Sequence, residues 1–378
     1  MLYRDFGLTG KKVSLLGFGG MRFEKIDDHD DCVRTILAAA EGGVNYFDTA
    51  PAYFGIKSET VFGKAFAELK RRKIPFYSAT KTTAASPSAI RKEIDAQLKR
   101  LNTDVIDFYH IWCINSLENW QNRKKKGVLR TFIKLKEEGL IRHICVSSHL
   151  IGDEIRELLL EGVFEGVLFG YSAYNFNTRQ SAFDAIREKK LGAVVMNPLG
   201  GGVIPQHPEL FGFLRRKDES TTTAAIRFLW DHPEISVTLV GFENQAQVRE
   251  ALAAMEGYKP RTVKELETLK AGAGASMEGI CTGCAYCVDN KTGVSCPQNI
   301  PIPKFMDAYN QKLFSQMGAS GERASAGKKD PIDGRLRFHW ELKRSVAGTC
   351  TACGKCEKAC TQHIEIIKRL KEIAAEPK

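Results

Sequence analysis

The residues best suited to acid–base chemistry lie in the stretch 46–53, YFDTAPAY. An aromatic run ends in Asp48, a turn follows, and Tyr53 presents a phenol five residues later. A phenol with its ordinary pKa of about 10 is a weak acid near neutrality, and a nearby cation favours its ionised form. Lys81, which ends the next strand-like run at 76–81, supplies that cation. We therefore expect Tyr53 to transfer a proton, Lys81 to lower the pKa of Tyr53, and Asp48 to hold Lys81 in place.

A second set of chemically capable residues is a group of cysteines near the C-terminus. Of the 11 cysteines, all but Cys32, Cys113 and Cys145 lie between 281 and 360. In a chain for which we expect no secretory signal, such clustering favours metal over disulfides. Two C-x2-C-x2-C runs each bind three corners of a cubane, and the remote cysteine of each run completes the other cluster. We predict one [4Fe–4S] cluster on Cys281, Cys284, Cys287 and Cys360, and a second on Cys350, Cys353, Cys356 and Cys296. Paired C-x2-C units also bind zinc, which is the alternative.

Alternating β-rich and amphipathic runs must position these side chains. The expected strands are 13–19, 44–48, 76–81, 105–112, 143–148, 166–173, 192–197 and 236–241. The expected helices are 28–42, 58–70, 87–101, 117–139, 152–161, 179–190, 221–231 and 244–255. Eight strand–helix units within about 250 residues match a (β/α)₈ barrel, and a doubly wound open sheet is the competing α/β architecture. The count of eight, and the polar residues at the strand ends, favour the barrel.

Length and composition set the remaining limits. A chain of 378 residues exceeds the ~250–300 at which one core stops growing, and the glycine- and alanine-rich stretch 271–276 predicts a boundary between domains at 1–270 and 271–378. No apolar run approaches the ~20 residues of a membrane span, so we expect a cytoplasmic protein without a membrane partner. The net charge is +10, yet the basic clusters 123–126 and 215–217 are short and lack interleaved aromatics. We therefore expect no nucleic-acid partner, and an acidic ferredoxin or flavodoxin as a possible protein partner.

Several motifs occur in the order of a known family. They are the stretches 17–22, 47–53, 79–81, 141–147 and 197–201, of sequence GFGGMR, FDTAPAY, ATK, IRHICVS and NPLGG. The first 256 residues resemble an aldo/keto reductase, and the cysteine-rich tail makes the chain similar to a subgroup that carries a ferredoxin-type domain. The resemblance implies a (β/α)₈ TIM barrel followed by a small α-helical, ferredoxin-like iron–sulfur domain.

The resemblance also implies a catalytic group of Asp, Tyr, Lys and His. Asp48, Tyr53 and Lys81 match it, but Trp112 stands where the family has its histidine. His110, two positions earlier, shares a strand face with Trp112. It is either a displaced catalytic histidine or a core histidine satisfied by a hydrogen bond. Trp112 is expected to form a wall of the substrate pocket.

A nicotinamide site is the third implication of the resemblance. The residues it assigns to the cofactor are Gly19, Gly20, Met21, Ser147, Tyr171, Met196, Pro198, Leu199, Gly241, Asn244 and Gln247. Met196 stands where an aromatic residue would stack on the nicotinamide, and Tyr171 stands near the place of an amide ligand. The basic residues that usually hold a 2′-phosphate are absent. We expect NADP(H) or NAD(H), with flavin in the same pocket as the alternative.

These features predict an oxidoreductase that reduces or oxidises a small carbonyl or alcohol substrate, with electron transfer through two [4Fe–4S] clusters. A nicotinamide transfers a hydride whereas each cluster takes one electron, so direct exchange is poor without a flavin-like intermediate. One alternative is an NADPH-dependent carbonyl reductase whose clusters are structural. The other is a non-catalytic redox sensor or electron-carrier subunit.

Overall fold

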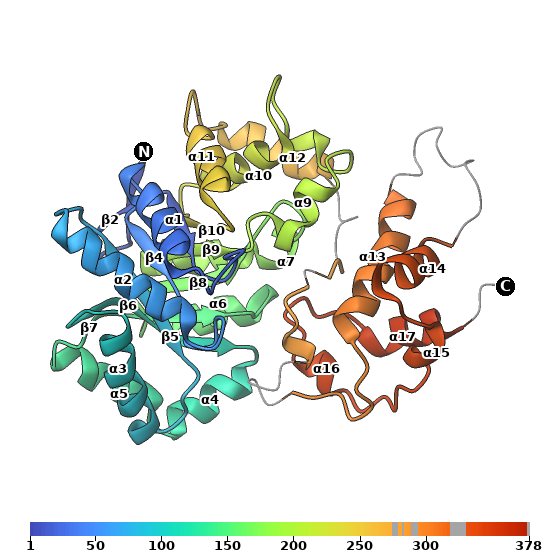
Figure 1. Ribbon diagram of the computed structural model, residues 1–378, viewed down its shortest axis with the longest axis horizontal. Helices are drawn as coiled ribbons and strands as arrows, with labels where there is room; N and C mark the ends of the chain where they lie inside the picture. The colour runs from blue at the N-terminus through green and yellow to red at the C-terminus, as the bar shows by residue number, and fades with distance from the viewer. Residues whose placement is uncertain (274–278, 282, 289–293, 318–329, 376–378) are drawn as a thin grey trace. The chain divides into compact units, whose positions relative to one another are not determined.

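A computed structural model describes residues 1–273, 279–281, 283–288, 294–317 and 330–375 (Figure 1). The chain forms two compact units. The first contains Met1–Pro198 and Arg216–Glu267, and the second contains Leu199–Arg215 and Thr268–Lys378. None of the helices formed by the described residues is long and apolar enough to cross a membrane.

The first unit is a closed barrel of eight parallel strands, which confirms the predicted (β/α)₈ fold. The strands are β3 (Leu16–Gly19), β4 (Tyr46–Asp48), β5 (Tyr77–Thr82), β6 (Ile106–Ile114), β7 (Ile141–Ser148), β8 (Gly166–Gly170), β9 (Gly192–Met196) and β10 (Val237–Gly241). Each strand pairs with the next in sequence, and β10 closes the barrel by pairing with β3, with Thr238 opposite Leu16. An antiparallel hairpin of β1 (Tyr3–Asp5) and β2 (Lys12–Ser14) precedes the barrel.

Amphipathic helices accompany the strands (Figure 1). They are α1 (His29–Glu41), α2 (Lys57–Arg71), α3 (Pro87–Arg100), α4 (Leu117–Lys125), α5 (Val128–Glu137), α6 (Gly152–Leu160), α7 (Phe176–Arg179), α8 (Ser181–Lys189), α10 (Thr221–Trp230), α11 (Gln245–Ala253) and α12 (Val263–Ala273). The expected single helix 117–139 is wrong: Gly127 adopts φ +84° and separates α4 from α5. Glycine allows this left-handed conformation without a Cβ clash.

Strand alternation stacks the barrel interior in layers. Tyr46, Ala79, Phe108, Cys145 and Val194 belong to one buried apolar cluster inside the barrel. Side chains two residues apart on a strand share a face. The next inward position toward the carboxyl end of each of these strands therefore holds Asp48, Lys81, His110, Ser147 and Met196 respectively. Apart from Met196, the inward-facing residues thus change from apolar to polar between these two layers, at the end of the barrel where this fold carries its active sites.

The second unit is helical. Its elements are η1 (Gly200–Gly202), α9 (Val203–Gln206), η2 (Gly212–Leu214), η3 (Tyr286–Val288), α13 (Ile302–Met317), α14 (Pro331–Arg335), η6 (Leu336–Trp340), α15 (Arg344–Ala347), α16 (Lys355–Lys358) and α17 (Ile366–Ala374). Phe305 and Met306 of α13 share a buried core with Leu336 and with Leu370 of α17. Cys287 and Cys356 are buried in the same core, so cysteines and apolar residues are packed together.

Candidate active site

Asp48 and Lys81 form a buried ion pair at the ends of neighbouring strands. The Lys81 Nζ donates to Asp48 Oδ1 over 2.6 Å, and each side chain is 1% exposed. Burial raises the pKa of Asp48 and the ammonium of Lys81 opposes that shift. Asp48 Oδ2 has no hydrogen-bond partner among the described residues. The pair therefore holds Lys81 in one position and leaves one carboxylate oxygen without a partner among the described residues.

Tyr53 lies beside this pair on the loop that follows β4. The Lys81 Nζ is 5.3 Å from the centroid of the Tyr53 ring. The indole of Trp112 meets the same ring edge-on, with centroids 5.9 Å apart, and lies 6.0 Å from Lys81 Nζ. The pKa of Tyr53 is raised well above 10, first by burial and then by the charge of Asp48. The expected lowering of this pKa is therefore not found in the ligand-free chain, because burial and the charge of Asp48 outweigh the positive charge nearby.

His110 lies next to Lys81 inside the barrel. The two residues are paired across β5 and β6, and His110 is fully buried. Its Nδ1 is 3.3 Å from the carbonyl oxygen of Thr80. A carbonyl oxygen only accepts hydrogen bonds, so Nδ1 carries the proton. The Nε2 atom has no partner among the described residues, and burial together with Lys81 lowers the pKa of His110 to about 3. His110 is thus a neutral imidazole with an available acceptor nitrogen.

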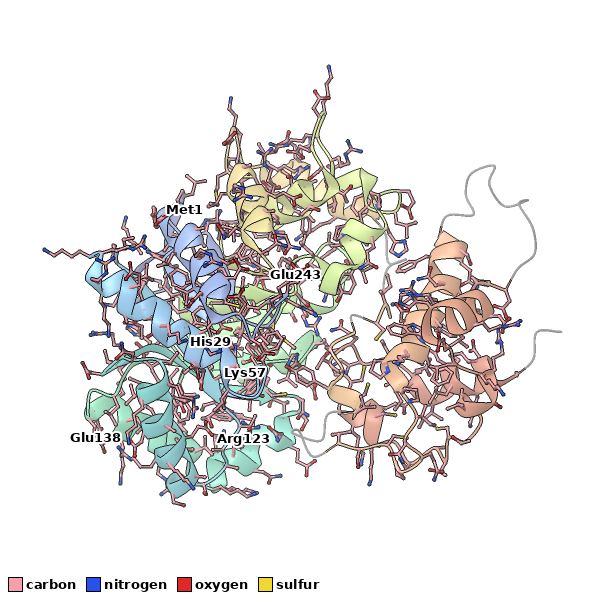
Figure 2. The ribbon with its side chains drawn as sticks, viewed as in Figure 1. Met1, His29, Lys57, Arg123, Glu138 and Glu243 are labelled. Carbon is pink, nitrogen blue, oxygen red and sulfur yellow. The ribbon has the colours of Figure 1, made fainter. Side chains whose placement is uncertain are left out.

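A bulge in β6 positions Trp112. The pairing of β6 with β7 shifts between Ile111 and Ile114, and Cys113 adopts φ +63°. Bulges redirect side chains and occur next to active sites. Arg123 of α4, which is labelled in Figure 2, donates from a guanidinium nitrogen to the Trp112 carbonyl oxygen over 2.7 Å. This contact fixes the bulge that brings Trp112 to Tyr53.

The glycines and hydroxyl assigned to a nicotinamide lie at the same end of the barrel. Gly241 of β10 pairs with Gly19 of β3, and a Cβ on Gly241 would lie 2.6 Å from the Arg22 Cγ. Ser147 ends the inward face of β7, and its Oγ has no partner among the described residues. Met196 is the last residue of β9 and is partly buried against the barrel core. Glycines let a ligand lie close to the backbone, and a buried hydroxyl without a partner among the described residues could hydrogen-bond to that ligand.

The eight tail cysteines line two separate cavities in the second unit. One is lined by Cys281, Cys284, Cys287 and Cys360, and the other by Cys296, Cys350, Cys353 and Cys356. All eight are free of disulfides. Among the described residues, no three Cys, His or carboxylate side chains come together closely enough for a single metal ion.

Comparisons with known proteins identify the family of the barrel and of the cysteine-rich tail. Residues 15–271 match the model of the aldo/keto reductase family. The chain belongs to this family. Residues 280–365 match a 4Fe-4S dicluster domain, so the aldo/keto reductase barrel is followed by an iron–sulfur domain.

L-galactose dehydrogenase of Arabidopsis thaliana is 30% identical over 70% of this chain and 93% of that protein. The NADH-specific methylglyoxal reductase of Escherichia coli (strain K12) is 27% identical over 52% of this chain and 67% of that protein. Aldo-keto reductase AKR11C1 from Bacillus halodurans (holo form) superposes with a TM-score of 0.63 at 25% identity, covering 73% of this chain and 97% of that one. With relatives named as dehydrogenases and reductases, the protein is an oxidoreductase.

One predicted cofactor residue of this aldo/keto reductase, Tyr171, contacts the surrounding helices. Tyr171 follows inward-facing Gly170 by one residue and therefore faces the helices. Its hydroxyl lies 3.0 Å from His232 Nε2, and its ring packs on Phe183 with centroids 4.8 Å apart. The Tyr171 side chain therefore points away from the barrel interior, where a cofactor ligand would be expected.

Two further predicted cofactor residues serve the first turn of α11. The Asn244 Oδ1 accepts from the backbone nitrogens of Ala246 and Gln247 at 3.1 and 3.2 Å. The Gln247 side chain bonds to Glu243. Of the remaining predicted residues, Gly20 and Met21 follow β3 directly, and Pro198 and Leu199 follow β9. All four therefore lie on loops at the carboxyl end of their strands.

Two arginines near the barrel mouth were missed by sequence reasoning. Arg22 contributes positive charge that lowers the pKa of Tyr53, against the larger effect of burial. Arg179 is buried, and its Cζ would lie 3.7 Å from a Cβ placed on Gly170. Arg22 follows the glycine pair in the motif at 17–22, which is a usable signal, whereas nothing in the local sequence marks Arg179.

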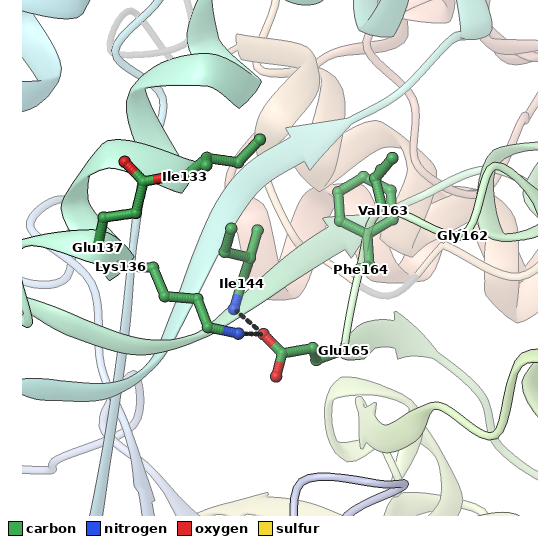
Figure 3. Close-up of a pocket in the computed structure, with 8 residues that line it drawn as sticks. All are labelled: Ile133, Lys136, Glu137, Ile144, Gly162, Val163, Phe164 and Glu165. Carbon is green, nitrogen blue, oxygen red and sulfur yellow. Dashed lines mark hydrogen bonds and ion pairs between the residues drawn. The ribbon is translucent and has the colours of Figure 1, made fainter.

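A surface depression is also present at the opposite end of the barrel strands (Figure 3). It lies between α5 and the starts of β7 and β8, and it is lined by Ile133, Lys136, Glu137, Ile144, Gly162, Val163, Phe164 and Glu165. Glu165 accepts from Lys136 Nζ over 2.6 Å and from the Ile144 backbone nitrogen over 3.1 Å. Lys136 and Glu165 are thus paired with each other, and residues at this end of a (β/α)₈ barrel serve stability rather than chemistry.

Proposed function

We propose that this oxidoreductase interconverts a small carbonyl compound and its alcohol at the carboxyl end of the barrel, and that its two clusters exchange single electrons with the reaction. The observation that carries the proposal is the buried Asp48–Lys81 pair beside Tyr53 and Trp112. A cation held beside a phenol within an apolar wall is an arrangement for proton transfer to a bound oxygen.

Tyr53 is the proton donor in the reductive direction. Its raised pKa keeps the phenol protonated in the ligand-free chain. Once the proton leaves, Lys81 lies close enough to favour the phenolate, and Asp48 holds Lys81 there. In the oxidative direction the phenolate takes the alcohol proton back. Neutral His110 offers Nε2 as an acceptor, so it can orient a hydroxyl group but cannot donate to a carbonyl oxygen from that nitrogen.

The cofactor in the barrel is proposed to be NADP(H) or NAD(H), with flavin as the alternative. When bound, it supplies a hydride to the substrate carbon. Gly19 and Gly241 would allow its close approach, Ser147 Oγ would hydrogen-bond it, and Met196 would contact its ring. A thioether does not stack as an aromatic ring does, which is why flavin stays an alternative.

The two groups of four cysteines are proposed to hold two [4Fe–4S] clusters, which supply single-electron transfer. An acidic ferredoxin or flavodoxin is the proposed external partner, because the chain has a net charge of +10. If the clusters are only structural, the protein is a carbonyl reductase that needs no such carrier.

Replacing Tyr53 with Phe tests the proposal. The ring and its contact with Trp112 are retained while the proton donor is lost, so carbonyl turnover with NADPH should fall by about 10²–10⁴. Tyr77→Phe is the matched control, because Tyr77 is the first residue of β5, at the end of the strand opposite to Lys81. Unchanged turnover in Tyr53→Phe would refute the catalytic role. No turnover of any carbonyl or alcohol by the wild type, with clusters intact, would favour a redox sensor.

A further inference from the structure

Four buried polar residues form a layer behind β5, on the side that faces the helices. Thr80 of β5, Tyr109 of β6, Glu59 of α2 and Gln97 of α3 are each fully buried. Thr80 and Tyr109 alternate with the inward-facing Lys81 and His110, so they point away from the barrel interior. Burying polar groups in an apolar core is costly unless each one is hydrogen-bonded. This layer is therefore stable only as a connected network.

Glu59 and Gln97 are the centre of that network. Glu59 Oε1 accepts from Thr80 Oγ1 at 2.8 Å and from Gln97 Nε2 at 3.0 Å. Glu59 Oε2 accepts from Arg100 Nε at 2.7 Å, which pairs the buried carboxylate with a cation. Gln97 Oε1 accepts from the Tyr109 hydroxyl at 2.8 Å. These side-chain hydrogen bonds thus connect α2 and α3 to β5 and β6.

The network reaches the active site through the backbone of β5. Gln97 Nε2 donates to the carbonyl oxygen of Lys81 over 2.9 Å. The preceding carbonyl oxygen, that of Thr80, meets His110 Nδ1 at 3.3 Å. Thr80 itself is held by Glu59 through its hydroxyl. Residues outside the barrel thus hold two backbone carbonyl groups in place. One belongs to Lys81, and the other, that of Thr80, contacts the protonated nitrogen of His110.

We infer that Gln97 and Glu59 are positioning residues of the active site. They hold the Thr80–Lys81 segment of β5, which keeps Lys81 on Asp48 and beside Tyr53 and keeps the His110 proton on Nδ1. Neither residue touches the substrate. The inference rests on the proposed carbonyl chemistry for its kinetic effect, but the state of the His110 ring is a consequence that needs no substrate.

The test compares Gln97→Met with the wild type in the full chain. Methionine keeps the length of the side chain and removes its hydrogen bonds. Glu93→Gln is the control, because Glu93 pairs with Arg100 at 3.2 Å, is not one of the four residues of the buried layer, and is partly exposed. Thr80→Val is a second variant for the case that Gln97→Met does not fold, since it deletes only the hydroxyl donated to Glu59.

Nitrogen NMR of the histidine rings is the first measurement, with the His110 signal assigned by its loss in His110→Asn. The wild type and Glu93→Gln should show the Nδ1-protonated ring, and Gln97→Met and Thr80→Val should show a shifted or mixed ring. Carbonyl turnover is the second: kcat should fall by about 10–100-fold with KM nearly unchanged, because a displacement of about 1 Å costs up to ~10²-fold.

Folded Gln97→Met and Thr80→Val proteins with wild-type ring signals and wild-type kcat would overturn the inference. A wild type that shows the Nδ1-protonated ring but turns over no carbonyl would refute the proposed function instead. In that case the ring signals of the variants still decide whether Gln97 and Glu59 position His110.

Discussion

Replacing Asp48 with Asn should destabilise the barrel more than the loss of one ion pair would normally suggest. The substitution keeps the shape of the side chain but removes its charge. Lys81 then carries an ammonium group that is 1% exposed and has lost its counter-ion. The carboxamide oxygen can still accept a hydrogen bond, so the measured effect comes from charge rather than from packing.

The size of the effect follows from the geometry. Opposite charges 2.6 Å apart attract by about 6 kcal/mol at an effective dielectric constant of ~20, and the desolvation of both groups offsets much of that. Leaving one partner of a buried pair behind costs about 3–5 kcal/mol. Removing both charges in Asp48→Asn/Lys81→Met should cost far less than the sum of the two single variants, because no uncompensated charge remains.

Urea unfolding followed by circular dichroism measures this cost. With a slope of roughly 3 kcal/mol per molar urea, the midpoint of Asp48→Asn should fall by roughly 1–1.7 M. Asp27→Asn is the matched control, since Asp27 pairs with Lys57 at the surface and should show no resolvable shift. The reasoning is refuted if Asp48→Asn lowers the midpoint no more than Asp27→Asn, or if the double variant is as unstable as the sum of the singles.

Three further outcomes are expected. Burial and Lys81 lower the pKa of His110 from 6.5 to about 3, so between pH 6.5 and 3 the unfolded chain binds a proton at this residue that the folded chain does not. The free energy of unfolding should therefore decline by about 1.4 kcal/mol for each unit that the pH falls in this window. His110→Asn should remove that part of the pH dependence in urea unfolding. Cys353→Ser should lower the iron content of the anaerobically reconstituted protein from about eight toward about four atoms per chain, whereas Cys145→Ser, in the barrel core, should leave it unchanged. Gly241→Ala places a Cβ 2.6 Å from the Arg22 Cγ, so nucleotide titrations should show weaker binding, and unchanged affinity would contradict the placement of the cofactor at this glycine.

Strand alternation explains why much of the site could be predicted. Asp48 and Lys81 end consecutive strands with the same inward phase, so a closed parallel barrel brings them together. The same alternation assigns Tyr171 to the outer face, one residue past inward Gly170. The assignment of Tyr171 to the cofactor came from a resemblance, which does not take strand phase into account.

Other features depend on tertiary contacts that no local pattern encodes. The bulge at Trp112 needs φ +63° at Cys113 and a hydrogen bond from Arg123, which lies on the following helix. The direction of the pKa shift of Tyr53 depends on how deeply its hydroxyl is buried and on the pairing of Lys81 with Asp48. Neither burial nor pairing is visible in the spacing of the three residues.

An anaerobic titration tests the proposed link between barrel and clusters most directly. Iron, sulfide and flavin are counted in the reconstituted protein, and NADPH is then added while the visible absorbance of the clusters is followed. The proposal predicts a loss of absorbance when flavin is present, because a flavin can take the hydride of one NADPH as an electron pair and pass the two electrons singly to two clusters. NADPH that binds and reduces a carbonyl substrate without any change in cluster absorbance would contradict it and leave a carbonyl reductase with structural clusters.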